Sequence, residues 1–523
     1  MFQSINTIKI LMFLFVLSQI SRVSGQNELD AKRMVSTGLA GTARVQAMGG
    51  AFSAAGGDFT SSLLNPAGLA LYKRSDFMLT TGLRFVKHNS LYLGQNDDAL
   101  KTRAGITNLG LVIHGGYRPY ESRESRQDKT PKLTSYAFSV GFNQLENYHR
   151  QTQAYGYNSQ NSFSSFLASI AQGTLPSQIT PGSLADMGYY VWLIDPKSGD
   201  SANYNAAAPN RVNQSISRNE TGRLNEWNFG LSGNFEDLLY LGMTVGFRNL
   251  EYSSTYNFEE ADPGQIHNSW GAYNSSTADS VGFNTMTYTD EFRTSGTGFN
   301  LGLGVIVRPS DFARLGLSIQ TPTWYALSDR YSSSLVNRSD QNEVYAFNSE
   351  LGQFNYNLAT PYKITGGVSF ILAKALLLNG DVDVLDYRNT RFSSIVYGFR
   401  TENNAIRNVF DRAYNFRLGA EYKYGPIYLR GGYAWFDPVM NELGNSYSDI
   451  TTNGTVKINA GRQNLTGGIG YREDAFYVDL GVIRSRTQDK YSVYAANNLT
   501  GFSPVLVNKI NVLAYVVTMG LRF

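Results

Sequence analysis

Leu513–Phe523, at the carboxyl end of the chain, reads LAYVVTMGLRF, and this stretch decides the fold. An apolar side chain stands at every second position, at Leu513, Tyr515, Val517, Met519, Leu521 and Phe523. A period of two gives a β-strand one apolar face. The sequence therefore predicts a long amphipathic strand at the end of the chain.

The same alternation recurs upstream, within 239–248, 299–308, 376–384 and 416–423. The face opposite the apolar one carries many glycines, namely Gly242, Gly246, Gly302, Gly304, Gly419, Gly432, Gly468, Gly470 and Gly481. It also carries charges of both signs, namely Asp381, Asp383, Arg417, Glu421, Arg430, Arg472 and Asp479. The pattern predicts an all-β protein whose strands have one apolar face and one polar or glycine-rich face.

The composition is unusual for a water-soluble protein. Of 523 residues, 17% are charged and 13% are aromatic, whereas soluble domains contain roughly 25% charged residues. The absence of cysteine excludes disulfides and thiolate metal sites. A net charge of +3 without a block of like charge gives no reason to expect a nucleic-acid partner.

Residues 1–25 predict a secretory signal peptide. Lys9 precedes the apolar run 10–17, and Val23, Ser24 and Gly25 suit a signal peptidase. The run is shorter than the roughly 20 residues that a spanning helix needs, and no later stretch approaches that length. The exported chain is therefore either soluble or inserted in a membrane as a closed β-barrel.

Alternation alone does not exclude a soluble β-sandwich, but three features favour a transmembrane antiparallel barrel over 76–523. The strands reach the roughly 9 to 11 residues that cross a bilayer, and aromatic residues gather at their ends. The terminal Phe523 resembles the signal by which the assembly machinery of the bacterial outer membrane inserts barrels. Candidate strands lie near 76–87, 105–117, 134–148, 226–236, 238–258, 286–308, 312–332, 343–372, 375–391, 412–424, 426–436, 463–473, 475–487 and 507–523.

These segments give about fourteen strands if Pro361 is a kink within one strand, and an even number is expected of such a barrel. The tight turns at 424–426 and 472–474 predict the periplasmic side. We expect an outer-membrane protein of a Gram-negative bacterium, in contact with outer-membrane lipid and monomeric, although the sequence does not fix the oligomeric state.

Residues 38–70 are rich in Gly and Ala and precede the first strand. Their distinctive residues are Met48, Gly49, Gly50, Ala51, Phe52, Asp58, Asn65, Pro66, Ala67, Gly68, Leu69 and Ala70. This combination resembles the N-terminal hatch of the FadL and TodX family of outer-membrane transporters. Residues 429–438 and 467–471 resemble two late strands of that family more weakly.

The resemblance implies a hatch at 26–75 inside a fourteen-stranded barrel. It also implies passive uptake of hydrophobic small molecules, such as long-chain fatty acids or aromatic hydrocarbons, by capture outside, passage to a lumenal pocket and lateral release. Inward glycines would leave room for the hatch, and lumenal charges would hold it through Lys32, Arg33, Arg44 and Asp58. Alternatively, these charges are solvated pore lining.

A long extracellular loop is expected at about 147–225. Phe163, Phe166, Leu167 and Ile170 follow helical spacing, and Leu184, Met187 and Trp192 form a second apolar group. These residues predict either an external groove for a ligand or a cap on the barrel. In the family, lateral exit depends on a distorted third strand, whose counterpart here contains Gly141, Phe142 and Asn143.

No cofactor or metal site is expected, because the four histidines are scattered and no G-x-S-x-G motif occurs. We therefore do not expect an enzyme. A second functional hypothesis follows from a resemblance to barrels of this fold that act as protein-binding shuttles in a secretion apparatus. A polar porin is disfavoured by the hatch.

Overall fold

The computed structural model describes residues 28–36, 38–116, 132–267, 282–441, 446–449, 454–457, 461–494 and 502–523. The expected signal peptide, 1–25, lies outside the described residues. The described chain forms a closed antiparallel β-barrel of fourteen strands, as the sequence predicts. In order around the barrel, its strands are β1 (Asp76–Tyr92), β2 (Gln95–Gly116), β3 (Leu133–Asn147), β7 (Val212–Phe235), β8 (Leu239–Ala261), β9 (Phe283–Ser310), β10 (Ala313–Gln320) continued by β11 (Trp324–Ser339), β13 (Gly352–Ala359) continued by β14 (Lys363–Leu372), β15 (Leu376–Asp386), β17 (Arg412–Tyr424), β18 (Ile427–Phe436), β21 (Arg462–Arg472), β22 (Phe476–Ser492) and β23 (Val505–Arg522).

Two adjacent barrel strands are interrupted at the same height by proline. Pro322 separates β10 from β11, and Pro361 separates β13 from β14. Proline has no N–H to donate to a neighbouring strand. The two breaks are joined instead by Thr360 N, which donates to Thr323 O at 3.1 Å, and by Thr323 N, which donates to Thr360 Oγ1 at 2.9 Å. The prediction that Pro361 lies within one barrel strand is therefore confirmed.

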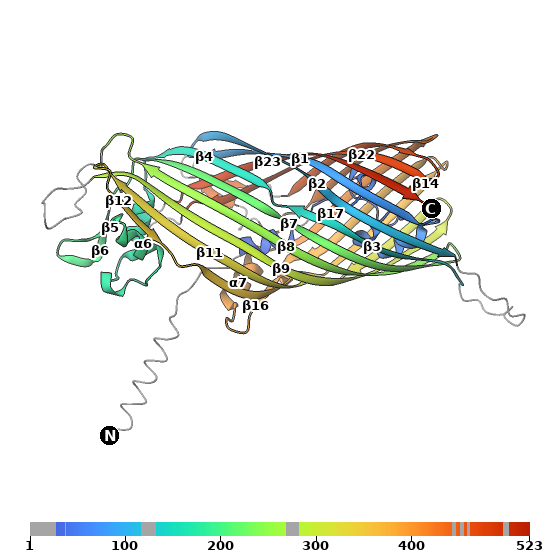
Figure 1. Cartoon of the computed structure of the whole chain (residues 1–523), viewed down its shortest axis with the longest axis horizontal. Coiled ribbons are helices and arrows are strands. Elements are labelled where there is room, and N and C mark those ends of the chain that lie inside the picture. Colours follow the sequence, from blue (N-terminus) through green and yellow to red (C-terminus); the bar gives the residue numbers. More distant parts are fainter. Residues whose placement is uncertain are drawn as a thin grey trace, which may run out of the picture.

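The two ends of the barrel differ in their connections (Figure 1). The C-terminus lies at the end with short turns, where Ser75 and Phe523 exchange two backbone hydrogen bonds of 3.0 Å. The predicted turns 424–426 and 472–474 are at this end. Short connections are typical of the periplasmic side, and we refer to the opposite end as the extracellular end.

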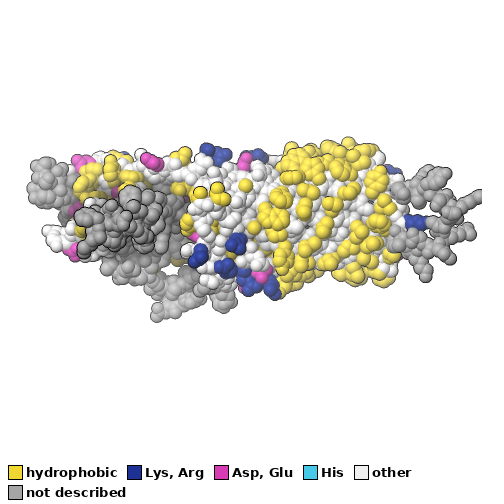
Figure 2. Space-filling model, turned by 90° about the horizontal axis from the view of Figure 1, so that it is seen from below, with side chains coloured by type: hydrophobic (Ala, Val, Ile, Leu, Met, Phe, Trp, Pro, Cys, Tyr) yellow, Lys and Arg dark blue, Asp and Glu magenta, His cyan; other side chains and the backbone are white. Residues whose placement is uncertain are grey.

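Apolar side chains form a band around the half of the barrel near the C-terminus (Figure 2). A row of aromatic side chains marks its extracellular limit, because the strand registers align Phe142, Trp227, Phe247, Phe299 and Trp324 on five neighbouring strands. The ring centroids of Phe142 and Trp227 are 5.6 Å apart, and those of Phe299 and Trp324 are 5.1 Å apart. Aromatic rows of this kind stand at the interface between membrane and water.

The barrel wall extends far beyond this aromatic row. β8 continues from Arg248 to Ala261, with small or polar residues such as Ser253 and Thr255 on its outer face. Several strands extend further in this direction than the sequence indicates. β4 (Arg150–Asn158) pairs with β7, which begins at Val212, so the connection without barrel strands covers 159–211 rather than the expected 147–225.

The remaining elements are short and lie inside the barrel or in the connections on its extracellular side. The helices are α2 (Glu28–Val35), α3 (Ala43–Ala47), α4 (Ser61–Leu64), α5 (Phe163–Ala171), α6 (Leu184–Tyr190), α7 (Arg400–Val409), and the 3₁₀ turns η1 (Pro66–Leu71), η2 (Pro176–Gln178) and η3 (Tyr387–Asn389). The additional strands are β5 (Ile194–Lys197), β6 (Asp200–Ala206), β12 (Val344–Asn348), β16 (Arg391–Ser393), β19 (Ser446–Asp449) and β20 (Gly454–Lys457). Of these elements, α7 and β16 stand about halfway along the barrel (Figure 1). Among the described residues, no helix combines the length and the apolar character needed to span a bilayer.

Candidate functional site

Residues 43–72 lie inside the barrel, and we call them the lumenal segment. In Figure 1 this segment is the dark blue chain within the half of the cylinder near the C-terminus. It comprises α3, α4 and η1, and nearly all of its side chains are buried. The interior of the barrel at the level of the apolar band is therefore occupied by the chain itself.

Short polar contacts fix the conformation of the lumenal segment. Thr42 caps α3 by accepting a hydrogen bond from Val45 N, and its hydroxyl donates to both oxygens of Asp58 at 2.9 Å. Asn65 caps η1 by accepting from Ala67 N at 3.2 Å, while its amide donates to Ser53 O at 2.8 Å. Pro66 stands at the first position of η1, where no N–H is required. Asp58 thus stabilises the segment itself and not its contact with the barrel.

Glycines of the barrel wall let the lumenal segment approach the strands closely. A Cβ added at Gly432 would lie 2.3 Å from Gly49 N, and one at Gly304 would lie 1.9 Å from Asn65 Oδ1. A Cβ at Gly242 would lie 2.3 Å from the carbonyl carbon of Pro66. These glycines face inward, as expected from the sequence. The inner wall can therefore carry no larger side chain at these positions while the segment is in place.

Carboxylates of the wall bind the lumenal segment directly. Asp381 accepts hydrogen bonds from Phe52 N at 2.8 Å, Ser53 N at 2.9 Å and Ser53 Oγ at 2.7 Å. Arg44 donates two hydrogen bonds to Glu421, at 2.6 and 2.9 Å. Buried carboxylates require such partners because an unpaired buried charge is strongly unfavourable.

Most of the other expected lumenal charges pair with one another and not with the segment. Arg417 binds Asp383 at 2.6 and 2.8 Å. Arg430 bridges Glu421 at 2.6 Å and Asp479 at 2.7 Å, and Arg472 also pairs with Asp479. Of the predicted lumenal residues, Asp381 and Glu421 contact the segment, and Arg430 is linked to it through Glu421. Lys32 and Arg33 of α2 lie elsewhere, at a cavity on the extracellular side of the segment.

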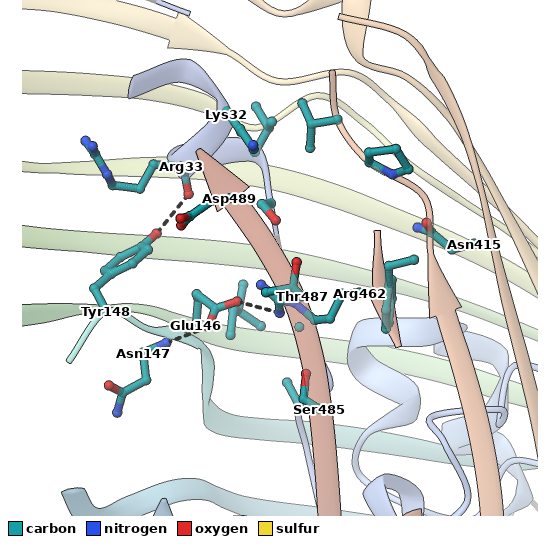
Figure 3. A pocket seen from close by; sticks show the side chains of 18 of the residues that line it. Lys32, Arg33, Glu146, Asn147, Tyr148, Asn415, Arg462, Ser485, Thr487 and Asp489 are labelled. Carbon is teal, nitrogen blue, oxygen red and sulfur yellow. Dashed lines mark hydrogen bonds and ion pairs between the residues drawn. The ribbon is translucent and has the colours of Figure 1, made fainter. Parts of the chain in front are cut away.

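This cavity has a volume of about 320 Å³ and lies between α2 and the barrel wall (Figure 3). One side is formed by Glu146, Asn147 and Tyr148, where the chain passes from β3 to β4. The Tyr148 hydroxyl donates to Arg33 O at 3.2 Å, and Arg462 donates to Glu146 at 2.9 Å. The lining also includes apolar side chains, namely Leu29, Val35, Leu63, Leu64, Val86, Leu145, Leu385, Phe436, Val439, Ile510 and Val512.

Cations outnumber carboxylates in the lining of this cavity. It contains Lys32, Arg33, Arg84, Arg150, Arg218, Arg248, Lys363, Arg417, Arg462 and Lys490, against Glu146, Glu220, Asp383, Asp437 and Asp489. Arg150 binds Glu220 through two hydrogen bonds. Within the described part of the chain, Lys32, Arg218 and Lys363 make no ion pair. The cavity therefore combines apolar surface with more cations than carboxylates, and Arg218 packs against the rings of Tyr256 and Tyr491 at 5.0 and 4.7 Å.

The barrel wall beside the cavity has a break in its hydrogen bonding. β2 and β3 are paired only from Asn108–Asn143 to Gly116–Ser135. From 95 to 107, β2 has no partner strand on this side among the described residues, and its register with β1 shifts at Thr107. The three residues predicted for lateral exit lie at the edge of this break. Asn143 is the last residue of β3 that pairs with β2. Gly141 packs against Phe59 of the lumenal segment, and Phe142 belongs to the aromatic row.

The expected groove residues lie in a cap over the extracellular end. Phe163, Phe166, Leu167 and Met187 are buried in one cluster with side chains of the barrel strands. Leu184 is partly buried, whereas Ile170 and Trp192 are 45% and 38% exposed. The buried four pack against one another and the barrel, so they form no open groove, and none of the seven lines the described cavity. This packing fits the alternative that the two clusters cap the barrel.

Glu260, near the extracellular end of β8, holds this cap. Its carboxyl group accepts hydrogen bonds from Phe163 N at 2.7 Å and from Gln214 Nε2 at 2.6 Å, while Oε2 has no hydrogen-bond partner among the described residues. Burial raises the pKa of Glu260 to about 8. A carboxyl group whose pKa is raised in the folded state stabilises it at low pH and loses that contribution as the pH rises through the raised pKa.

We therefore expect the cap to loosen as the pH rises from about 5 to about 8, with proteolysis of 159–211 accelerating about tenfold or more. Glu260→Gln should remove most of this pH dependence, whereas Glu259→Gln, at the exposed neighbouring position, should leave it intact. Limited proteolysis at a series of pH values measures both. An unchanged pH profile in Glu260→Gln would show that another group controls the cap.

No group of three or more His, Cys, Asp or Glu side chains suited to a metal ion occurs in the described residues.

The predicted hatch residues Gly49, Gly50, Asp58, Asn65, Pro66, Ala67 and Gly68 all lie in the lumenal segment. The sequence reasoning missed the cationic cavity, because its residues come from many separate strands and from α2.

Comparison with solved structures agrees with this fold. The chain is similar to a Pseudomonas aeruginosa FadL homologue, with 12% sequence identity over 92% of this chain and 98% of that one and a TM-score of 0.50. It also matches the toluene transporter TodX of Pseudomonas putida (15% identity, 93% and 99% coverage, TM-score 0.49) and the toluene transporter TbuX of Ralstonia pickettii (14% identity, 93% and 98% coverage, TM-score 0.45).

No known family profile and no curated protein sequence matches the chain. At such low identity the match to the FadL homologue concerns the fold alone. It confirms the barrel architecture that the sequence resemblance implied.

Proposed function

We propose that the protein carries hydrophobic molecules with an anionic head group, such as long-chain fatty acids, passively across the outer membrane of a Gram-negative bacterium. The observation that carries this proposal is the cavity above the lumenal segment, in which apolar surface adjoins unpaired cations. An apolar surface favours a hydrocarbon chain. Lys32 and Arg218 would bind a carboxylate, whereas a neutral hydrocarbon would form no ion pair with either of them.

The proposed path leads from outside, past the cap, into the cavity and then sideways through the wall to the outer edge of the membrane, because the break begins at Asn143, next to Phe142 of the aromatic row. The lumenal segment supports lateral release, since it occupies the interior below the cavity. The break between β2 and β3 lies beside Glu146–Arg150, which line the cavity. The predicted hatch role of the segment, and the predicted gate role of Gly141, Phe142 and Asn143, belong to this proposal.

Uptake can be tested in a strain that lacks the protein. Complementation with the wild-type chain should restore uptake of radiolabelled oleate at low concentration, and should have a smaller effect on toluene. If oleate uptake is the same with and without the protein, while secretion components copurify with it, the protein-binding shuttle replaces this proposal.

Filling the break in the wall should slow release without affecting binding. Gly105 lies in the unpaired part of β2, and a Cβ there would meet nothing within 4 Å. A side chain at this position therefore begins without a clash, and we expect Gly105→Trp to reduce oleate uptake about tenfold with an unchanged Kd in detergent. Gly116→Trp, on the same strand where a Cβ would also meet nothing within 4 Å, is the matched control. Equal uptake by the two variants would exclude lateral release beside Gly105.

A further inference from the structure

A group of cations stands on the outer surface of β22, β23 and β1, which lie side by side (Figure 1). Arg484 aligns with Leu513, and Leu513 aligns with Phe85; the next outward residues on these two strands, Asn511 and Lys87, are polar. Arg486 aligns with Asn511 one row further from the membrane. Lys509 follows in the next row. The three cations thus begin where the lipid-facing surface ends.

These cations are exposed and lack internal counter-ions. Arg484, Arg486 and Lys509 are exposed, and none of them forms an ion pair with any residue that the structure describes. The nearby Lys87 differs, since it binds Asp98 at 2.7 Å. Amide side chains at Asn511 and Gln488 add further hydrogen-bond donors to the same rows. The surface therefore carries more positive than negative charge, since the nearby carboxylate of Asp98 is paired with Lys87.

We propose that this surface binds the phosphate groups of a phosphorylated glycolipid in the outer leaflet. Head groups lie at the height at which the apolar band ends, and guanidinium groups bind phosphate through paired hydrogen bonds. Cations near an anionic membrane surface contribute to binding in a way that salt screens. Two other exposed cations of the barrel stand further from the apolar band. Arg293 and Arg330 face each other across β9 and β11, six residues beyond Phe299 and Trp324.

This difference supplies a matched control for the test. Arg484→Gln/Arg486→Gln and Arg293→Gln/Arg330→Gln each remove two exposed positive charges from the outer surface. The purified full-length proteins in detergent are titrated with diphosphorylated lipid A, and with the same lipid after removal of its phosphates. Native mass spectrometry measures the bound lipid. Heat-dependent migration on gels shows that each variant is a folded barrel.

We expect the first variant to bind diphosphorylated lipid A about 25-fold more weakly than the wild type, since each surface cation contributes about a factor of five. The second variant should bind like the wild type, and the dephosphorylated lipid should not distinguish the three proteins. Equal weakening in both variants, or equal binding of both lipids by the wild type, would overturn the proposal. Oleate uptake is not measured, so failure would leave the transport proposal untouched.

Discussion

Replacing Gly432 with leucine is expected to open the barrel to water. The new Cβ would lie 2.3 Å from Gly49 N and 2.3 Å from the carbonyl carbon of Met48. Both contacts are with backbone, so no change of side-chain rotamer relieves them. Overpacking of this kind costs about 1 to 3 kcal/mol, which shifts the equilibrium toward a displaced lumenal segment by roughly fivefold to 150-fold. Single-channel recording in planar bilayers should show a corresponding rise in the open fraction.

The neighbouring residue provides the control. Gly431 faces the lipid, and a Cβ there would meet nothing within 4 Å, so Gly431→Leu should conduct like the wild type. The comparison can be repeated on β14, where a Cβ at Gly367 would meet Ser53 and Asp381 and one at Gly366 would meet nothing. If the inward and outward variants conduct equally, the lumenal segment does not block the passage of water.

The membrane-spanning half of the barrel could be predicted from the sequence because two different solvents act on its two faces. Lipid requires apolar side chains at alternate positions such as Leu241 and Met243, and the lumenal segment requires small ones such as Gly242. Each requirement leaves its own period-two pattern. The number of strands could be predicted by counting these patterns and by requiring an even number, as is usual for a barrel of a single bacterial chain.

The extracellular half was harder to predict because water lies outside it. On β7, the outer residues 213–225 are polar, so no apolar alternation distinguishes this strand from a loop. Its strand conformation depends on pairing with β4 and β8, which are distant in sequence. A weaker signal existed on the inner face of β8, where Tyr252, Tyr256 and Phe258 alternate with polar residues.

The candidate site was predictable only in part, for a related reason. Helical spacing identified one face of α5, but spacing does not reveal what packs against that face. Phe163 and Phe166 contact Tyr494, which lies more than 300 positions away in the chain. The cavity brings together α2 and strands from β1 to β23, so its excess of positive charge is a property of the fold. The sequence around Lys32 or Arg218 contains no local pattern that predicts this excess of positive charge.

We expect the positive charge of the cavity to have a large effect on the binding of a fatty acid. Lys32→Met/Arg218→Met should weaken the binding of oleate by about two to four orders of magnitude, because each charge-assisted hydrogen bond in a site shielded from water contributes about 1.5 to 3 kcal/mol. Lys32 is attracted by Asp489 and repelled by Arg150, and Arg218 is attracted by Glu220. Methionine keeps an unbranched apolar chain in each place. Isothermal titration of the detergent-solubilised protein measures the change in Kd.

Two controls separate the loss of head-group binding from a general disturbance of the cavity. Methyl oleate has the same hydrocarbon chain without the charge, so its Kd should be nearly equal in the wild type and the variant. Arg293→Met/Arg330→Met removes two charges from the outer surface and should bind oleate like the wild type. Should the double cavity variant lose oleate and methyl oleate to the same extent, the cations act on the shape of the cavity. The preference for an anionic head group would then have to be abandoned, because a selective electrostatic contact must distinguish the acid from its ester.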